Sequence, residues 1–117
     1  MTNLTPDIIQ WGAERGLHES NDLKPQLTKL IEELGEIAAG VARDDRTRII
    51  DGVGDLLVVL INFGVVFAKR FHENDLIDQQ RIKEDFLDLC LHAAWREIKD
   101  RKGVTQDGVF VKEEEST

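Results

Sequence analysis

One stretch of the chain, residues 56–68, constrains the fold more than any other. When it is placed on a helix of about 3.6 residues per turn, its residues are apolar on nearly every side, which is typical of a helix buried on most sides. We expect this helix to span about residues 47–71. A chain of 117 residues can hardly enclose such a helix by itself. We therefore expect a homodimer, or a homotetramer.

A line of polar side chains interrupts this apolar helix. Asp51, Asp55 and Asn62 follow the spacing i, i+4 and i+11, so they lie along one side of it. A polar line in an otherwise apolar helix is not a solvated face. The pattern therefore indicates a function for these three residues.

Apolar positions at helical spacing predict three further helices, at about residues 5–16, 23–42 and 76–101. Residues 43–46 form a tight polar break between the second and third helices. The side chains that we expect on the core side of the fourth helix are Ile82, Phe86, Leu89, Ala93 and Ile98.

The predicted fold class is therefore all-α, a four- to five-helix bundle made by a single domain over residues 1–112. Near its end, Gln106-Asp107-Gly108 is typical of a tight turn between apolar residues, so we expect a short C-terminal hairpin or an extended tail. Residues 113–117 are expected to be a disordered acidic tail.

Charge and composition narrow the function classes. The chain has 15 Lys+Arg against 23 Asp+Glu, a net charge of −8, which disfavours nucleic acid as a partner. Its one cysteine, Cys90, excludes an internal disulfide and favours a reducing compartment. The first residues lack the pattern of a signal peptide, and the apolar run at residues 56–61 is too short to span a bilayer. We expect a cytoplasmic protein with no membrane partner.

Carboxylates are concentrated on the second and third predicted helices. They are Glu32, Glu33, Glu36, Asp51 and Asp55. Two ionised carboxylates about 5 Å apart repel by roughly 3 kcal/mol at an effective dielectric of about 20. A hard divalent cation, which takes oxygen ligands, turns that repulsion into binding. A charged surface face is the open alternative and, for Asp51, a first-turn carboxylate favoured by the helix dipole.

The two helices bring these carboxylates to the same level if they form an antiparallel hairpin. At about 1.5 Å per residue, Glu33 is then level with Asp55, and Glu36 is level with the gap between Asp51 and Asp55. Gly52 and Gly54 leave room there for a ligand or for a close approach of the helices.

With these residues the chain resembles the MazG-like branch of the all-α nucleoside triphosphate pyrophosphohydrolases. That family carries a Glu-Glu-x-x-Glu segment on one helix and a carboxylate pair ending in Asp on the next. The matching segments are Glu32-Glu33-Leu34-Gly35-Glu36 and Asp51-Gly52-Val53-Gly54-Asp55. The likeness also covers Trp11, Gln26, Lys29 and Asn62, and residues 95–103 and 108–110, where the chain looks most like versions encoded by phages.

There is one departure from the family pattern. The family commonly has Glu three residues before the final Asp, and this chain has Gly52 at that position. Asp51, one residue earlier and with a shorter side chain, is the candidate replacement, so its role as a direct ligand is open.

The resemblance implies cleavage between the α- and β-phosphates of a nucleoside triphosphate (NTP or dNTP), giving the monophosphate and pyrophosphate. It implies Mg²⁺, for which Mn²⁺ can substitute, held by Glu33, Glu36, Asp51 and Asp55. Glu32 would orient or deprotonate the attacking water, so the implied catalytic set is Glu32, Glu33, Glu36 and Asp55. The implied substrate-binding residues are Asn62, Lys29, Trp11, Trp95, Lys99, Arg101 and Lys102.

Simpler structural roles stay open for several of these residues. The basic residues suit the C-terminus of a helix, either tryptophan can belong to a core, and Lys29 can pair with Glu33 one turn away. Two other functions also stay open: hydrolysis of a different nucleotide, such as dUTP or an alarmone, and a non-catalytic helical dimer that binds a nucleotide or a protein. A calcium loop is rejected because Leu56 occupies the position of its last ligand, and the histidines offer no zinc spacing.

Overall fold

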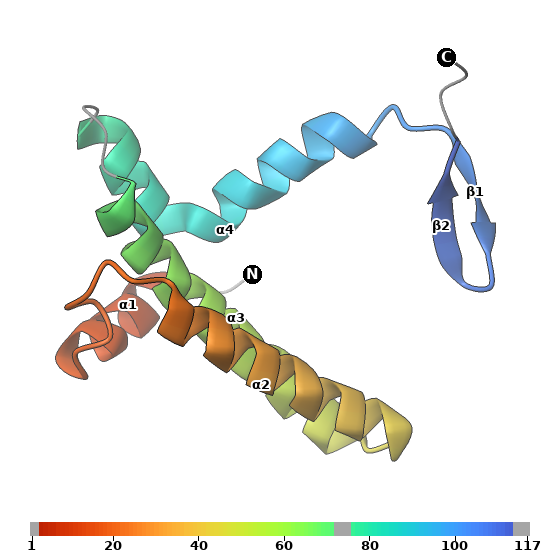
Figure 1. The fold of residues 1–117 in the computed structure, drawn as a ribbon, viewed down its shortest axis with the longest axis horizontal. Coiled ribbons are helices and arrows are strands. Elements are labelled where there is room, and N and C mark those ends of the chain that lie inside the picture. Colours follow the sequence, from red (N-terminus) through yellow and green to blue (C-terminus); the bar gives the residue numbers. More distant parts are fainter. Residues whose placement is uncertain (1–2, 72–75, 114–117) are drawn as a thin grey trace. The chain divides into compact units, whose positions relative to one another are not determined.

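The computed structural model describes residues 3–71 and 76–113, without the side chains of residues 76–81. Within these residues the helices and strands, in order along the chain, are α1 Thr5–Glu14, α2 Lys24–Ala42, α3 Arg46–Arg70, α4 Leu76–Ile98, β1 Gly103–Gln106 and β2 Val109–Lys112 (Figure 1). The protein is mostly helical with a small C-terminal hairpin, as expected. By its contacts the chain divides into two compact units, Met1–Leu87 and Asp88–Thr117, which are described separately below. The single domain over residues 1–112 stays a prediction.

The first unit is built on an antiparallel hairpin of α2 and α3 (Figure 1). The break between them is short because Asp44 takes a positive φ of 53° and Asp45 caps the next helix. The Asp45 side chain accepts a hydrogen bond from the Arg48 backbone N–H at 3.2 Å. The tight polar break predicted at residues 43–46 is confirmed, except that Arg46 already belongs to α3.

Two glycines let α2 and α3 approach closely. A Cβ atom on Gly52 would lie 2.8 Å from Cγ1 of Ile37, and one on Gly40 would lie 3.1 Å from the backbone nitrogen of Ile49. Gly52 therefore serves the helix contact, one of the two roles expected for it. Gly54 is different, because a Cβ there would meet no atom within 4 Å.

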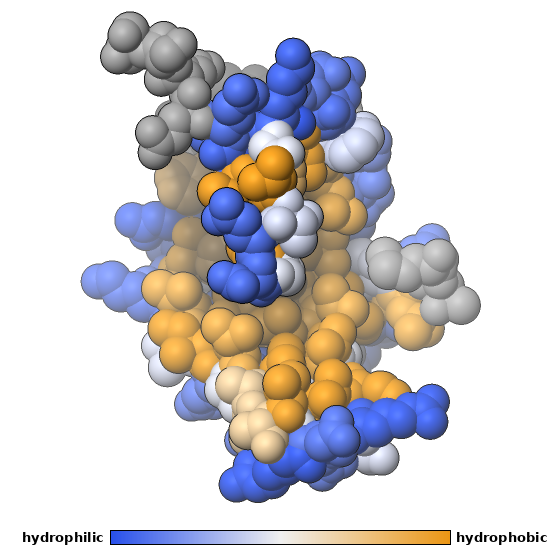
Figure 2. All heavy atoms as spheres, turned by 90° about the vertical axis from the view of Figure 1, so that its right-hand side faces the viewer, coloured by the Kyte–Doolittle hydropathy of each residue, from blue (hydrophilic) through white to orange (hydrophobic). Residues whose placement is uncertain are grey.

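The buried apolar side chains of the described residues all lie in the second half of α3. They are Val59, Ile61, Val65, Val66 and Ala68. The first half exposes Ile50, Val53 and Leu57, so the predicted buried helix is buried over only part of its length. Figure 2 shows apolar residues gathered at the surface near the end of the α2–α3 hairpin.

Phe86 closes one side of this core. Its ring centroid lies 5.8 Å from that of Phe63 and 5.2 Å from that of Phe67, and Gly64 makes room for it. The helical backbone of α4 is interrupted just before, at Asp85, which has φ −149° and ψ 50°. The predicted core position of Phe86 is thus confirmed.

The second unit contains the rest of α4 and the hairpin. Ala93 and Ile98 are exposed, so their predicted core positions are wrong. An apolar stripe predicts a helix, but it does not predict which element covers that stripe.

Strands β1 and β2 pair antiparallel, with Gly103 opposite Lys112 and Gln106 opposite Val109. Asp107 and Gly108 have φ of 51° and 80°, as a two-residue hairpin turn of this hand requires, so the predicted turn is confirmed. Of the predicted tail, residues 114–117 lie outside the described residues.

By length and composition alone, α3 is long and apolar enough to cross a membrane. The core helix of a soluble protein passes the same test. The predicted cytoplasmic location therefore stays a prediction.

Candidate functional site

Two concavities of the first unit contain most of the predicted site residues. The Trp11 pocket has a volume of about 370 Å³ and is lined by Trp11, Leu17, Pro25, Gln26, Lys29, Glu33, Asp55, Val58, Val59 and Asn62. The acidic pocket has a volume of about 340 Å³ and is lined by Glu36, Asp45, Thr47, Arg48, Asp51, Gly52 and Asp55. Asp55 lines both, so the two pockets adjoin at this residue.

Glu33 is the buried carboxylate of the site, with 9 % of the residue exposed. The helical spacing of α2 places Lys29 one turn before it, and Lys29 Nζ lies 3.6 Å from Glu33 Oε1. The same ammonium group lies 3.1 Å from Oε2 of Glu32. The hydrogen bond and charge of Glu32, followed by the charge of Glu33, raise the pKa of Lys29 above its ordinary value of 10.5. Lys29 is thus the counter-ion of two predicted site carboxylates.

Glu36 is paired across the hairpin with Arg48. Its Oε2 lies 2.9 Å from Arg48 Nη2 and 3.3 Å from Arg48 Nε. Arg48 was not among the residues predicted from the sequence. It lies in the first turn of α3, three residues before Asp51, and only the closed hairpin brings it to Glu36.

The predicted ligands lie along the hairpin, but they do not form one closed cage. Glu33 and Asp55 line the Trp11 pocket, whereas Glu36, Asp51 and Asp55 line the acidic pocket. In the part of the chain that the structure describes, no three His, Cys, Asp or Glu side chains are grouped closely enough to hold a metal ion. Mg²⁺ is commonly bound by one or two carboxylates together with water and substrate phosphates, and this donor set suits that mode of binding. The ligand set stays a prediction.

Asn62 lies in the wall of the Trp11 pocket and is almost fully buried, with 1 % exposed. Its Nδ2 donates to the Val58 carbonyl at 3.0 Å, and its Oδ1 lies 2.7 Å from His18 Nε2. Both polar atoms of the Asn62 side chain, which was predicted to bind substrate, therefore have hydrogen-bond partners within the protein. His18, which is also buried, had no predicted role, because its partner is 44 residues away in the sequence.

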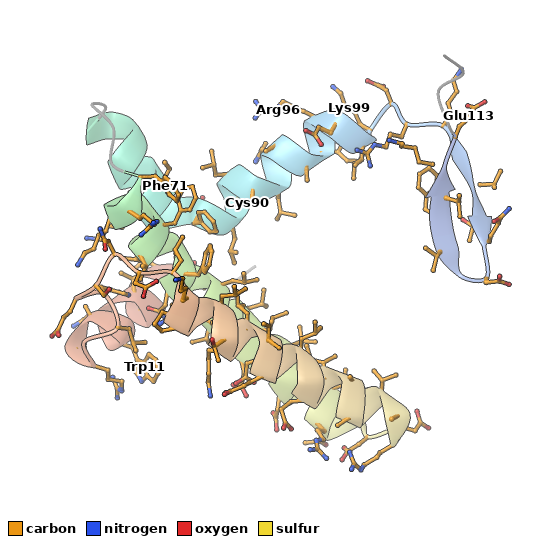
Figure 3. All side chains as sticks on the ribbon, viewed as in Figure 1. Trp11, Phe71, Cys90, Arg96, Lys99 and Glu113 are labelled. Carbon is orange, nitrogen blue, oxygen red and sulfur yellow. The ribbon has the colours of Figure 1, made fainter. Side chains whose placement is uncertain are left out.

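Trp11 lies on α1 (Figure 3) and lines the Trp11 pocket. The residue is 43 % exposed, and the Arg15 guanidinium lies 4.3 Å from the centroid of the Trp11 ring. Arg15 Nη1 also donates to the Trp11 carbonyl at 3.0 Å. Trp11 and Arg15, one helical turn apart, therefore form a cation–π contact that leaves much of the ring accessible.

The other predicted substrate-binding residues belong to the second unit. Trp95, Lys99, Arg101 and Lys102 are exposed. Arg101 Nη2 lies 3.8 Å from Oε2 of Glu97, one helical turn earlier. Lys99 is labelled in Figure 3. Their role in substrate binding stays a prediction.

Fold and site together define a small, mostly helical protein with a carboxylate-lined helical hairpin. No family model matches the chain, and no solved structure matches it. The chain is 34 % identical over 79 residues to a protein of Haemophilus phage HP1, described as an uncharacterized 18.2 kDa protein in the rep-hol intergenic region. The match covers 68 % of this chain and 46 % of the phage protein, so the chain spans less than half the length of that relative.

Proposed function

We propose that the chain is a Mg²⁺-dependent, MazG-like nucleoside triphosphate pyrophosphohydrolase. The observation that supports this is the position of Asp55. Its side chain lines the pocket that contains the buried Glu33, and it also lines the pocket that contains Glu36 and Asp51. One carboxylate therefore joins a mainly apolar pocket, suited to a nucleoside, to an acidic pocket suited to cations and phosphates.

The carboxylates hold Mg²⁺ in this proposal. Bound there, Mg²⁺ neutralises phosphate charge and lowers the pKa of a coordinated water. Glu32 is the candidate base, since it adjoins Glu33 and has a side chain that is 58 % exposed. To act as the base, Glu32 must first lose the hydrogen bond that it accepts from Lys29. The Lys29 ammonium group is then available to bind a phosphate oxygen.

The Trp11 pocket is the proposed nucleoside site. Its volume of about 370 Å³ falls in the range of small-ligand sites. Leu17, Val58 and Val59 supply apolar contacts, Trp11 supplies a ring face, and Gln26 supplies an amide. In this proposal a base stacks on Trp11 and the phosphates extend to Asp55, which lines the same pocket.

The partner in this proposal is a second copy of the chain. Large apolar side chains are exposed on α2 and α3 at helical spacing: Leu27, Ile31, Leu34, Val41, Ile50, Val53 and Leu57. We name these seven residues the apolar face. A contiguous exposed apolar patch of this kind is typical of an interaction surface.

The apolar face leaves the acidic pocket free. Glu36 follows Leu34 by two residues, so at about 100° per residue it points about 160° away from it around α2. A homodimer, or a tetramer, can therefore bury the apolar face while the acidic pocket stays open to substrate.

Pyrophosphate release from a panel of NTPs and dNTPs, with and without Mg²⁺, tests the proposed activity. We expect Mg²⁺-dependent formation of pyrophosphate and nucleoside monophosphate. Asp55→Asn should lower the rate at least about 100-fold, because a metal ligand contributes several kcal/mol to the transition state. Asp44→Asn is the matched control, since it makes the same change at the end of the hairpin and should keep full activity.

The same panel separates the rival functions. Turnover of dUTP alone, or of an alarmone alone, would identify a different nucleotide hydrolase. Thermal stabilisation by Mg²⁺ and nucleotide without any turnover would favour a binding protein. No product from any nucleotide, or full activity in Asp55→Asn, would contradict the proposed activity.

A further inference from the structure

Arg48 is a basic residue that lines the acidic pocket, and the proposed function gives it no role. It lies in the first turn of α3, where the helix dipole disfavours a positive charge. Its side chain crosses to α2 and contacts Glu36 through Nη2 at 2.9 Å and Nε at 3.3 Å. The contact with Glu36 offsets the unfavourable position on α3.

Both of these nitrogens contact the same oxygen, Glu36 Oε2. The ion pair is open to water, with 38 % of the Arg48 side chain and 57 % of the Glu36 side chain exposed. An exposed ion pair is weak and is screened by salt, so an ion of higher charge can displace the guanidinium.

A guanidinium displaced from Glu36 stays close to the pocket, because Arg48 lines it together with Asp51 and Asp55. Its planar set of N–H donors fits two oxygens of one phosphate group. Arg48 is therefore placed to bind either of two anions, the Glu36 carboxylate or a phosphate.

We propose that Arg48 exchanges one of these partners for the other. In the free protein it binds Glu36 and competes with a divalent cation for that carboxylate. Once the cation holds Glu36, Arg48 binds a phosphate of the polyphosphate. This inference rests on the proposed function, since it requires Glu36 to be a ligand of the cation. It has an unusual consequence: Arg48 weakens binding of the cation alone and strengthens binding of the polyphosphate.

Calorimetric titration of the full chain with Mn²⁺ alone tests the first effect. Arg48→Ala should bind Mn²⁺ about fivefold more tightly than the wild type, the size expected when an exposed ion pair no longer competes. Arg46→Ala is the matched control, because it removes the same charge from the same helical turn. It should change the affinity less than about twofold.

The Glu36→Gln background shows whether the effect passes through Glu36. There, Arg48→Ala should give no further gain in Mn²⁺ affinity. An equal gain in that background, or in Arg46→Ala, would mean that Arg48 acts only through its overall charge, and would overturn the inference.

Inorganic tripolyphosphate, titrated into protein saturated with Mn²⁺, tests the second effect. Arg48→Ala should weaken its binding about tenfold, and Arg48→Lys, which keeps the charge but loses the planar fork, should weaken it less. Unchanged tripolyphosphate affinity in Arg48→Ala would overturn the inference.

Failure of this inference can be told apart from failure of the proposed function. If the wild type binds no Mn²⁺, the proposed metal site and this inference fail together. If the wild type binds Mn²⁺ and Arg48→Ala binds it equally or less tightly, only the exchange by Arg48 is wrong.

Discussion

Gly12 determines how closely α1 can approach α3. It is buried, and a Cβ atom at this position would lie 2.0 Å from Asn62 Oδ1 and 2.9 Å from His18 Nε2. The space that a side chain would fill is therefore taken by the hydrogen bond between His18 and Asn62. This bond holds Asn62 in the wall of the Trp11 pocket, so Gly12 supports the candidate site without lining it.

Gly12→Ala should destabilise the protein by about 2–4 kcal/mol, because it overpacks a buried contact and disrupts a buried hydrogen bond. Chemical denaturation measures the change in the free energy of unfolding. Ala13→Ser, at the next and exposed position of α1, is the control and should change it by less than about 0.7 kcal/mol. Equal stability of Gly12→Ala and the wild type would mean that α1 does not lie against Asn62.

At the scale of elements, two adjacent aspartates with different structural roles form the turn of the α2–α3 hairpin. Asp44 supplies the positive φ of 53° that reverses the chain, whereas Asp45 caps α3 with its side chain. The reversal places Glu36 opposite Arg48 and brings Asp51 and Asp55 back alongside α2. The geometry of this turn therefore decides which carboxylates share a pocket.

Substitutions at these two neighbouring positions should change the free energy of unfolding in opposite directions. Asp45→Ala should lower the free energy of unfolding by about 1 kcal/mol through loss of the cap. Asp44→Gly should raise it by about 0.5 kcal/mol, since glycine takes a positive φ without a Cβ penalty. Denaturant midpoints of both variants measure the difference. A stabilising effect of Asp45→Ala would contradict the capping role.

At the scale of the whole molecule, the seven side chains of the apolar face remain exposed on the single chain. A single chain leaves the first half of α3 open, although its second half is buried. Association through this face would cover it, and large apolar interfaces are typical of permanent homodimers.

Leu34→Arg should therefore convert a dimeric or tetrameric wild type into a monomer, because it places a charge at the centre of an apolar contact. Sedimentation equilibrium measures the mass. Gln10→Arg, which adds the same charge at an exposed position of α1, should keep the wild-type mass. A monomeric mass for the wild type, or the same mass for Leu34→Arg as for the wild type, would contradict the proposed dimer.

The periodicity of the sequence predicted the helices well where they are long and amphipathic. Residues 23–42 were expected for the second helix, and α2 spans Lys24–Ala42. The turn at Asp107-Gly108 was predicted too, because its two positive φ angles demand those residue types. The interruption of α4 at Asp85 was not predicted, since no proline or glycine marks it.

For the candidate site, the sequence by itself determined which residues carry acid groups and that the spacing aligns Asp55 with Asn62 along one helix. Local chain geometry is enough for that. Only the tertiary structure decided the partners: His18 for Asn62 and Arg48 for Glu36, and the two pockets that share Asp55. These contacts join residues that are 44 and 12 positions apart, and such pairs form only when whole helices pack, so no local pattern encodes them.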